Sequence, residues 1–287
     1  MLAVLFGALS GALFGAMAVA VRHGLRRSGA DSEAGAVVVA WTATAVSLLA
    51  ALVEHGHVRP GQLWPFVVAG VLVPGCSQIL FIRAIGDVGA SRTAILVGTA
   101  PLISVAIALV LLDEPFRIAL LLGTLLVVAG GALLARERAR PHDFRAFGAA
   151  LALACAVLFG VRDNLVRWAA RDQHPPALLA STASLLAAAL TVSLVFVLLR
   201  RGYAIRVRRS AAAFVPAGVA LGAAYDCLFE AFDRGRVSIV APLNATQSLW
   251  AVVFAAVVVG AGEAIGRRLV AAAVLVVAGS AIVSVAR

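Results

Sequence analysis

The chain has 287 residues, of which 62% are apolar and only 13% are charged. Soluble domains have about 45–50% apolar and about 25% charged residues, and the apolar surplus here is too large for one buried core. The composition therefore excludes an ordinary soluble domain and predicts a protein embedded in a lipid bilayer.

The formal net charge of +10 comes from Arg alone, because all 24 basic residues are Arg. They lie in short runs between apolar stretches, as loop charges of membrane proteins do. A nucleic-acid surface needs clustered basic residues with stacking aromatics on a soluble face, so we expect no nucleic-acid partner. Cys76, Cys155 and Cys227 lie in apolar segments without metal-ligand spacing, and we expect no metal and no other cofactor.

Ten segments are long and apolar enough to form spanning helices, each of which takes about 20 residues. In chain order they are residues 2–21, 35–53, 63–83, 91–112, 117–135, 146–169, 177–199, 211–232, 237–259 and 266–285. The alternating pattern of membrane strands is absent. The sequence predicts an all-α integral membrane protein with ten transmembrane helices, which we expect in a cell (inner or plasma) membrane.

The two halves of the chain are related as repeats. Leu13-Phe14-Gly15 recurs as Leu158-Phe159-Gly160, Ser91 as Ser238, and Glu114 as Glu263, at offsets that grow from 145 to 149 residues. This pattern indicates one duplicated unit with small insertions. Because five helices is an odd number, the second unit must enter the membrane inverted, which is typical of secondary transporters. We predict a first five-helix repeat at residues 1–140 and a second, inverted one at residues 141–287.

One stretch of each half carries a recognisable pattern. Residues 91–135 contain Pro101, Asp113-Glu114-Pro115 and Gly130-Gly131, and the second half contains Ser238-Ile239-Val240-Ala241-Pro242-Leu243-Asn244, Gly262-Glu263 and Gly279. Both stretches resemble the EamA repeat of the drug/metabolite transporter superfamily. The resemblance implies ten helices, a central cavity lined mainly by helices 1, 3, 4, 6, 8 and 9, and export of small metabolites or drugs. Ser248 stands where the first repeat has Pro101, so we expect a straighter fourth helix in the second repeat.

Ionisable side chains inside the predicted spans are the candidates for function, because they are costly in a bilayer. The sixth span contains Arg162, Asp163, Asn164 and Arg167, and the eighth contains Asp226 and Glu230. At about 1.5 Å per residue, Arg162 and Asp226 lie at the same depth. We therefore expect Arg162 to pair with Asp226 or Glu230, and Asp163 to pair with Arg167 at i, i+4.

We expect a substrate site at this depth, formed by Arg162, Asn164, Asp226, Asn244, Gln247 and Trp250. The planar guanidinium of Arg162 would hold a substrate carboxylate, and Glu230 would carry the coupling proton. The alternative is structural: the charged side chains neutralise one another and fix helix packing, and Trp250 fills the core.

These features predict a secondary transporter that exports a small metabolite or drug by alternating access, coupled to protons or to exchange. The chain has no Walker-type GxxxxGK[ST] sequence for an ATPase, and we expect no catalytic residue. The alternatives are a membrane-embedded lipid-handling protein or enzyme, for which the His residues are too scattered, and a non-transporting membrane subunit. For the oligomeric state, a homodimer is one alternative.

Three further patterns concern helix packing, helix capping and the orientation of the chain in the membrane. Gly7, Gly11 and Gly15 form a GxxxGxxxG face that predicts close helix contact, and we expect Asp113 and Glu114 to cap the fifth helix. Loops at the ends of odd-numbered helices hold 16 of the 24 Arg residues. The positive-inside rule then places both termini outside the cell, whereas the family resemblance implies cytoplasmic termini.

Overall fold

The structure is a computed structural model that describes residues 1–28, 32–54, 59–77, 80–81, 84, 87, 96–135, 146–199, 203–259 and 267–285. Arg83, Ser91 and Glu263 lie outside these ranges. Within them the chain is helical and has no β-strand, which confirms the predicted all-α class.

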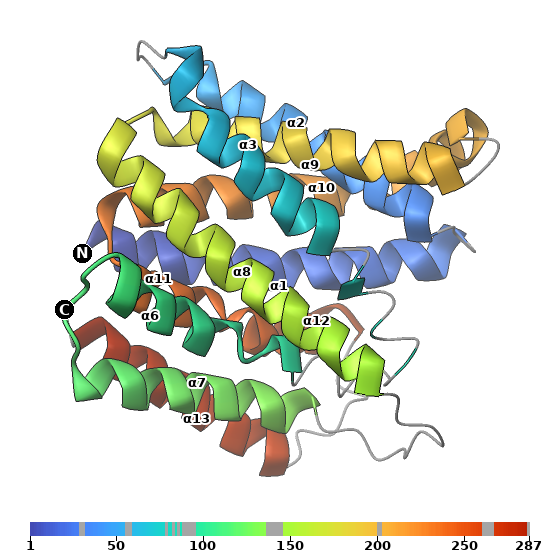
Figure 1. Ribbon diagram of the computed structural model, residues 1–287. Coiled ribbons are helices and arrows are strands. Elements are labelled where there is room, and N and C mark those ends of the chain that lie inside the picture. Colours follow the sequence, from blue (N-terminus) through green and yellow to red (C-terminus); the bar gives the residue numbers. More distant parts are fainter. Residues whose placement is uncertain are drawn as a thin grey trace.

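The helices follow the predicted spans closely (Figure 1). They are α1 (Leu2–Ser28), α2 (Ser32–Ala51), α3 (Trp64–Gly70), α6 (Ala100–Leu111), α7 (Ile118–Ala135), α8 (Ala146–Gln173), α9 (Ala177–Leu199), α10 (Tyr203–Arg234), α11 (Val237–Asn244), α12 (Gln247–Val259) and α13 (Arg267–Val285). The short η1 (Pro60–Gln62) precedes α3, and η2 (Val71–Cys76) continues it.

Among the residues that the structure describes, five helices are long and apolar enough to cross a membrane: Leu2–Val21, Ala34–Ala51, Phe147–Gln173, Ala177–Leu198 and Ala212–Arg234. Shorter apolar helices lie at Trp64–Cys76, Ala100–Leu111, Ile118–Leu133 and Val274–Val283. Large apolar side chains cover the outside, with Leu49, Val110 and Val257 being 66%, 75% and 76% exposed. A surface of this kind requires lipid as its solvent, and the chain is a multi-pass membrane protein.

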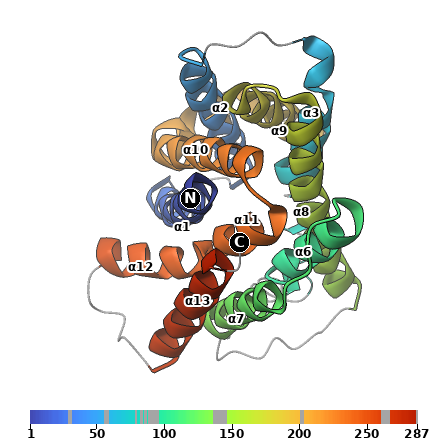
Figure 2. The ribbon, with the colours of Figure 1, turned by 90° about the vertical axis from the view of Figure 1, so that its left-hand side faces the viewer.

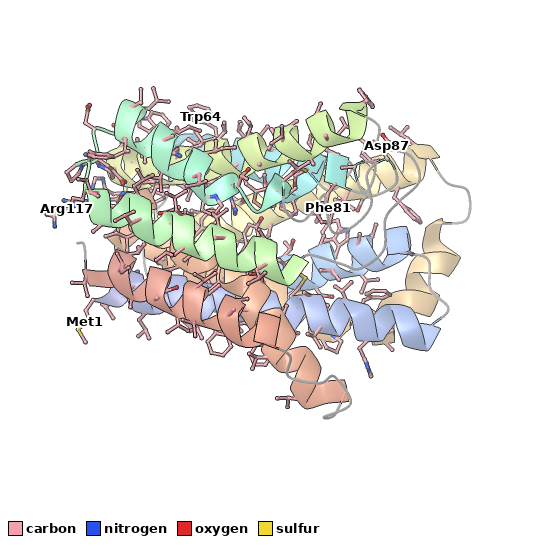
Figure 3. All side chains as sticks on the ribbon, turned by 90° about the horizontal axis from the view of Figure 1, so that it is seen from below. Met1, Trp64, Phe81, Asp87 and Arg117 are labelled. Carbon is pink, nitrogen blue, oxygen red and sulfur yellow. The ribbon has the colours of Figure 1, made fainter. Side chains whose placement is uncertain are left out.

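Both chain ends lie at the same end of the helix bundle (Figure 1). We call this end the terminal face; Figure 3 shows Met1 and Arg117 there and Asp87 at the opposite end. The last turns of α8 and α10 also reach the terminal face. Seen from this face, α1 lies between α10 and α12, and α11 lies near the centre (Figure 2).

The glycine face of α1 packs against the junction of α11 and α12, as predicted. Gly7 lies against Leu243, and a Cβ on Gly15 would be 2.6 Å from Trp250 Cβ. Gly11 faces the backbone oxygens of α11, where an added Cβ would meet Leu243 O at 3.0 Å. Only a residue without a side chain allows this approach.

The fourth helix of the second half is broken, and the expectation of a straighter helix is wrong. A two-residue turn separates α11 from α12, and Thr246 Oγ1 donates to Leu243 O at 2.7 Å. The same turn precedes α6, where Thr99 Oγ1 donates to Leu96 O at 2.6 Å. A threonine hydroxyl that bonds a preceding carbonyl competes with helix formation. The shared Leu-x-x-Thr sequence therefore accounts for both breaks, and Pro101 is not required.

Candidate functional site

Arg162 lies in the middle of α8 and is buried, with an exposed fraction of 1%. Its Nε is 2.9 Å from Asp163 Oδ1, and its guanidinium carbon is 5.6 Å from the ring centroids of Phe159 and Tyr225. An arginine between two aromatic rings and a carboxylate is well compensated for burial. Its Nη1, however, has no hydrogen-bond partner in the described part of the chain. This nitrogen is therefore free to bind a ligand.

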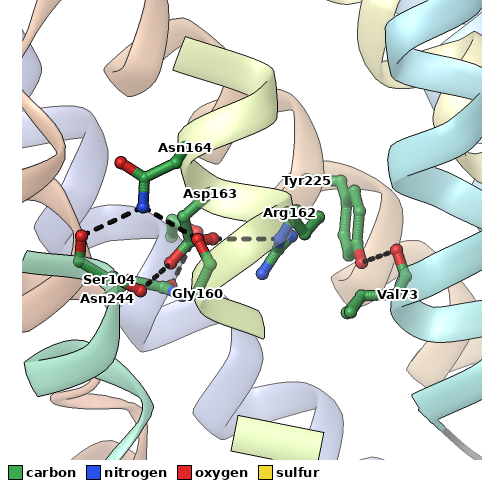
Figure 4. A network of polar contacts seen from close by, with 9 residues as sticks. Val73, Ser104, Gly160, Arg162, Asp163, Asn164, Tyr225 and Asn244 are labelled. Atoms are coloured by element: carbon green, nitrogen blue, oxygen red, sulfur yellow. Dashed lines mark hydrogen bonds and ion pairs between the residues drawn. The ribbon is translucent and has the colours of Figure 1, made fainter. Parts of the chain in front are cut away.

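Asp163 and Asn164 tie α8 to α6. Ser104 Oγ donates to Asp163 Oδ2 at 2.9 Å, and Asn164 Nδ2 donates to Ser104 O at 3.0 Å and to Gly160 O at 2.8 Å (Figure 4). The Oδ1 atom of Asn164 is buried without a partner among the described residues. An unpaired buried acceptor is unusual and calls for an explanation such as a bound molecule.

Tyr225 connects the same cluster to η2. Its hydroxyl donates to Val73 O at 3.2 Å (Figure 4). Val73 has extended dihedrals, φ −143° and ψ 119°, inside η2, and its carbonyl is therefore not used within a helix. The irregular backbone here is buried in protein, as it must be inside a membrane.

The predicted residues of α11 and α12 lie around the break between these helices. Asn244 Oδ1 is 3.1 Å from Ser10 Oγ, which also donates to Ala224 O at 2.8 Å. Gln247 begins α12 and is half-buried. Trp250 is 36% exposed and stacks on Phe254 with ring centroids 5.6 Å apart. Asn244 is therefore held by α1, while Trp250 presents part of its ring outside the packed core.

Asp226 does not pair with Arg162. Its Oδ1 accepts hydrogen bonds from Ser47 Oγ at 2.5 Å and from Ser181 Oγ at 2.7 Å. The carboxyl therefore points toward α2 and α9, and its place in the substrate site remains a prediction.

The other expected charge pairs also differ in the structure. Glu230 forms an ion pair with Arg234, one turn along α10. Arg167 Nη1 donates to the carbonyls of Phe232 and Asp233, at 2.7 and 2.8 Å, and does not pair with Asp163. Equal depth allowed the predicted pairs of Arg162 with Asp226 or Glu230, but the rotation of each helix about its axis decides which side chains meet. Within α8, Arg167 binds the end of α10 and Asp163 binds Arg162 and Ser104.

Glu114 caps a different helix from the one expected. Its Oε1 and Oε2 accept the backbone N–H groups of Val237 and Ser238 at 2.8 and 3.0 Å. It therefore caps the start of α11, not that of α7, and joins the two halves of the chain.

A cavity of about 570 Å³ opens beside this cap at the terminal face. Its polar lining residues are Asp113, Glu114, Arg167, Arg171, Asp172 and Arg236. None of the predicted substrate-binding residues lines it. Apolar side chains of α8, α10 and α11 pack between the Arg162 cluster and the terminal face: Val166, Phe229, Phe232 and Val240.

Three residues that contact predicted site residues were not predicted from the sequence: Ser104, Phe159 and Tyr225. Serines are common in membrane helices, and the ring positions depend on contacts between distant segments. One usable signal was present, since Tyr225 is one of only two Tyr residues and directly precedes Asp226.

Comparisons with known proteins agree with this architecture. The profile of the EamA-like transporter family matches residues 1–136 and 146–285. One solved crystal structure, described only as that of a protein, superposes with a TM-score of 0.77 over 99% of this chain and 96% of its own. It is 22% identical in sequence, so the likeness shows the fold alone. Among curated proteins, none matches the sequence.

Proposed function

The chain belongs to the EamA-like transporter family, part of the drug/metabolite transporter superfamily, and we propose that it exports a small metabolite or drug by alternating access. The observation that carries the proposal is Arg162, a buried arginine of a membrane helix whose Nη1 has no partner in the described chain. A charged side chain buried inside a membrane helix is costly, and such a residue is a candidate for function. Arg162 would bind an anionic group of the substrate.

The proposed site keeps the residues inferred from sequence. Asn164 supports it with its unpartnered Oδ1, and Asn244, Gln247 and Trp250 support it by their place at the break between α11 and α12. Asp226 and Glu230 complete the set, with Glu230 as a candidate for proton coupling. Residues at helix breaks suit transport, because unwound backbone supplies polar groups to a substrate.

We also propose that the two five-helix units are inverted repeats, which alternating access would use. Gly15 lies against Trp250 on α12, and Gly160 lies against Ile103 on α6. Gly15 corresponds to Gly160 at an offset of 145, and Ile103 to Trp250 at 147. Exchanging each residue for its counterpart therefore turns one contact into the other, which a pseudo-twofold axis requires.

A second exchanged pair joins α7 and α13. Gly130 faces Ala272 O, and Gly279 faces Gly123 O, while the offsets from 123 to 272 and from 130 to 279 are both 149. Such mutual contacts between equivalent segments support the duplicated arrangement independently of the first pair.

The packing of the terminal face suggests which route the substrate takes in this state. Phe229, Phe232 and Val240 lie between the Arg162 cluster and that face and are 2% exposed or less. Access to the site would therefore come from the opposite face until these side chains separate.

The test compares cells that overproduce the native chain with cells that carry Arg162→Met or Glu230→Gln, at matched expression. Metabolites inside and outside are measured by mass spectrometry, with Asp172→Asn, an exposed acid at the terminal face, as the control. We expect the native chain and the control to move a small set of compounds outward and both site variants to lose this shift. No shift with the native chain would favour a lipid-handling protein, an enzyme or a non-transporting subunit.

A further inference from the structure

A second polar cluster lies between α2, α9 and α10. Ser47 and Ser181 donate to Asp226 Oδ1, and Thr182 Oγ1 lies 3.0 Å from Ser47 Oγ. Each of these four side chains belongs to a residue that is 8% exposed or less. Two helices, α2 and α9, therefore place three hydroxyl groups beside a single carboxyl group of a third helix, α10.

Asp226 differs from the neighbouring acids because it has no cationic partner. In the described part of the chain, Asp163 pairs with Arg162 and Glu230 pairs with Arg234, but no ion pair involves Asp226. An unpaired carboxylate is strongly disfavoured inside a membrane protein, whereas the neutral acid is tolerated. The hydrogen bonds from the hydroxyl groups are compatible with both the ionised and the protonated carboxyl group.

The spacing of the oxygen atoms favours a proton over a metal ion. Even around the small Mg²⁺ ion, octahedral ligands at about 2.0–2.1 Å are about 2.9 Å from one another. The hydroxyl oxygens of Ser47 and Ser181 are 2.5 and 2.7 Å from Asp226 Oδ1, which are hydrogen-bond distances. Oxygen atoms this close share a hydrogen atom, which favours a proton over a cation at this position. Because both hydroxyl groups use Oδ1, the acid proton belongs on Oδ2.

The cluster is close to the terminal face. α9 begins at Ala177, so Ser181 and Thr182 lie about 6–8 Å from its start at 1.5 Å per residue. At that start, Glu54 Oε2 accepts the N–H of Leu178 at 3.0 Å. The Glu54 carboxyl group, just beyond the end of α2, therefore lies between the cluster and the terminal face.

We propose that the Asp226 carboxyl group, held by Ser47 and Ser181, is a proton-binding site. At this level α1, α9 and α11 present no titratable side chain to α10. The charged or titratable groups at this level are Arg162 and Asp163 on α8 and Tyr225, Cys227 and Glu230 on α10, with Glu54 just beyond the end of α2. Only the use of this proton to drive transport rests on the proposed function; proton binding itself does not.

Infrared difference spectroscopy on the purified full chain in lipid bilayers tests the proposal without any transport. At a pH at which exposed acids are ionised, we expect the native protein to show the C=O stretch of a protonated carboxylic acid. The band should shift in D₂O, give way to carboxylate bands as the pH is raised, and disappear in Asp226→Asn. Glu230→Gln and the exposed-acid control Asp172→Asn should retain it.

Two results would overturn the proposal. Either the band persists in Asp226→Asn, which assigns it to another acid, or added sodium removes it at constant pH, which indicates a metal-ion site. If Asp226→Asn does not fold, as judged by size-exclusion chromatography, Asp226→Glu keeps the carboxyl and must shift the band. A native chain that exports nothing but shows the band would refute the exporter and leave this site in place.

Discussion

The surroundings of Arg162 stabilise its buried charge but leave one of its hydrogen-bond donors unpaired among the described residues. Its pairing with Asp163 and its position between Phe159 and Tyr225 compensate the burial of a charge. Its Nη1 is nevertheless left unpaired among the described residues, which a residue selected for stability alone would avoid. The unpaired donor is the feature on which the proposed substrate site depends.

Replacing Arg162 by an uncharged residue should destabilise the protein, because the Asp163 carboxyl group stays buried. We expect Arg162→Met to lower the free energy of unfolding by about 3–5 kcal/mol, because Asp163 is left buried and unpaired. Arg162→Met combined with Asp163→Asn should recover most of this loss. The measurement is denaturant unfolding in detergent, followed by circular dichroism.

The control is Arg234→Met, which breaks the half-exposed pair with Glu230 and should cost about 0–1 kcal/mol. Equal stability of Arg162→Met and the native chain would show that Asp163 does not need its partner.

At the scale of elements, Glu114 links a loop of the first half to a helix of the second. The first N–H groups of a helix lack partners within it, and both oxygens of this carboxylate bind such groups at the start of α11. The negative charge also complements the helix dipole. This bond holds α11 against the end of α6.

Glu114→Gln should weaken the junction, because an amide nitrogen cannot accept the second N–H group. We expect the free energy of unfolding to fall by about 1–2 kcal/mol. Asp113→Asn is the matched control, since Asp113 is exposed and Asn also tolerates its positive φ of 50°. The same denaturation assay applies. A loss as large in the Asp113 variant as in the Glu114 variant would argue against the cap.

At the scale of the whole molecule, the two faces of the bundle differ in charge. The terminal face contains the ends of α8 and α10, and Trp64 and Trp168 pair near it with ring centroids 6.3 Å apart. Tryptophans that are 52% and 40% exposed fit the membrane interface. The helix ends at the other face contain Arg22, Arg26 and Arg27 of α1, Arg206, Arg208 and Arg209 of α10, and Arg267 and Arg268 of α13. By the positive-inside rule we therefore expect that face in the cytoplasm.

Cysteine labelling in intact cells tests this orientation. The natural Cys76, Cys155 and Cys227 are first replaced by Ser. Single cysteines are then introduced at Arg117, on the terminal face, and at His23, an exposed position near the other end of α1. A membrane-impermeant maleimide should label Arg117→Cys and spare His23→Cys. The reverse pattern would give the orientation that the family resemblance implies.

Much of the fold was predictable because a bilayer restricts a chain severely. Length and apolarity are local properties, and they located the helices to within a few residues at most ends. The break between α11 and α12 was not predicted, because proline was expected to break the helix and Ser248 stands in place of Pro101. The Leu-x-x-Thr sequence that both halves share was the relevant signal.

Composition and a fixed rise per residue were enough to infer a lipid environment, a helical fold and the depth of each polar residue in the membrane. The partner of each polar side chain could be read only from the folded chain. In the structure Asp226 accepts hydrogen bonds from Ser47 and Ser181, and Arg162 pairs with Asp163. Pairing depends on the rotation and separation of helices, which packing contacts such as that of Gly15 with Trp250 set.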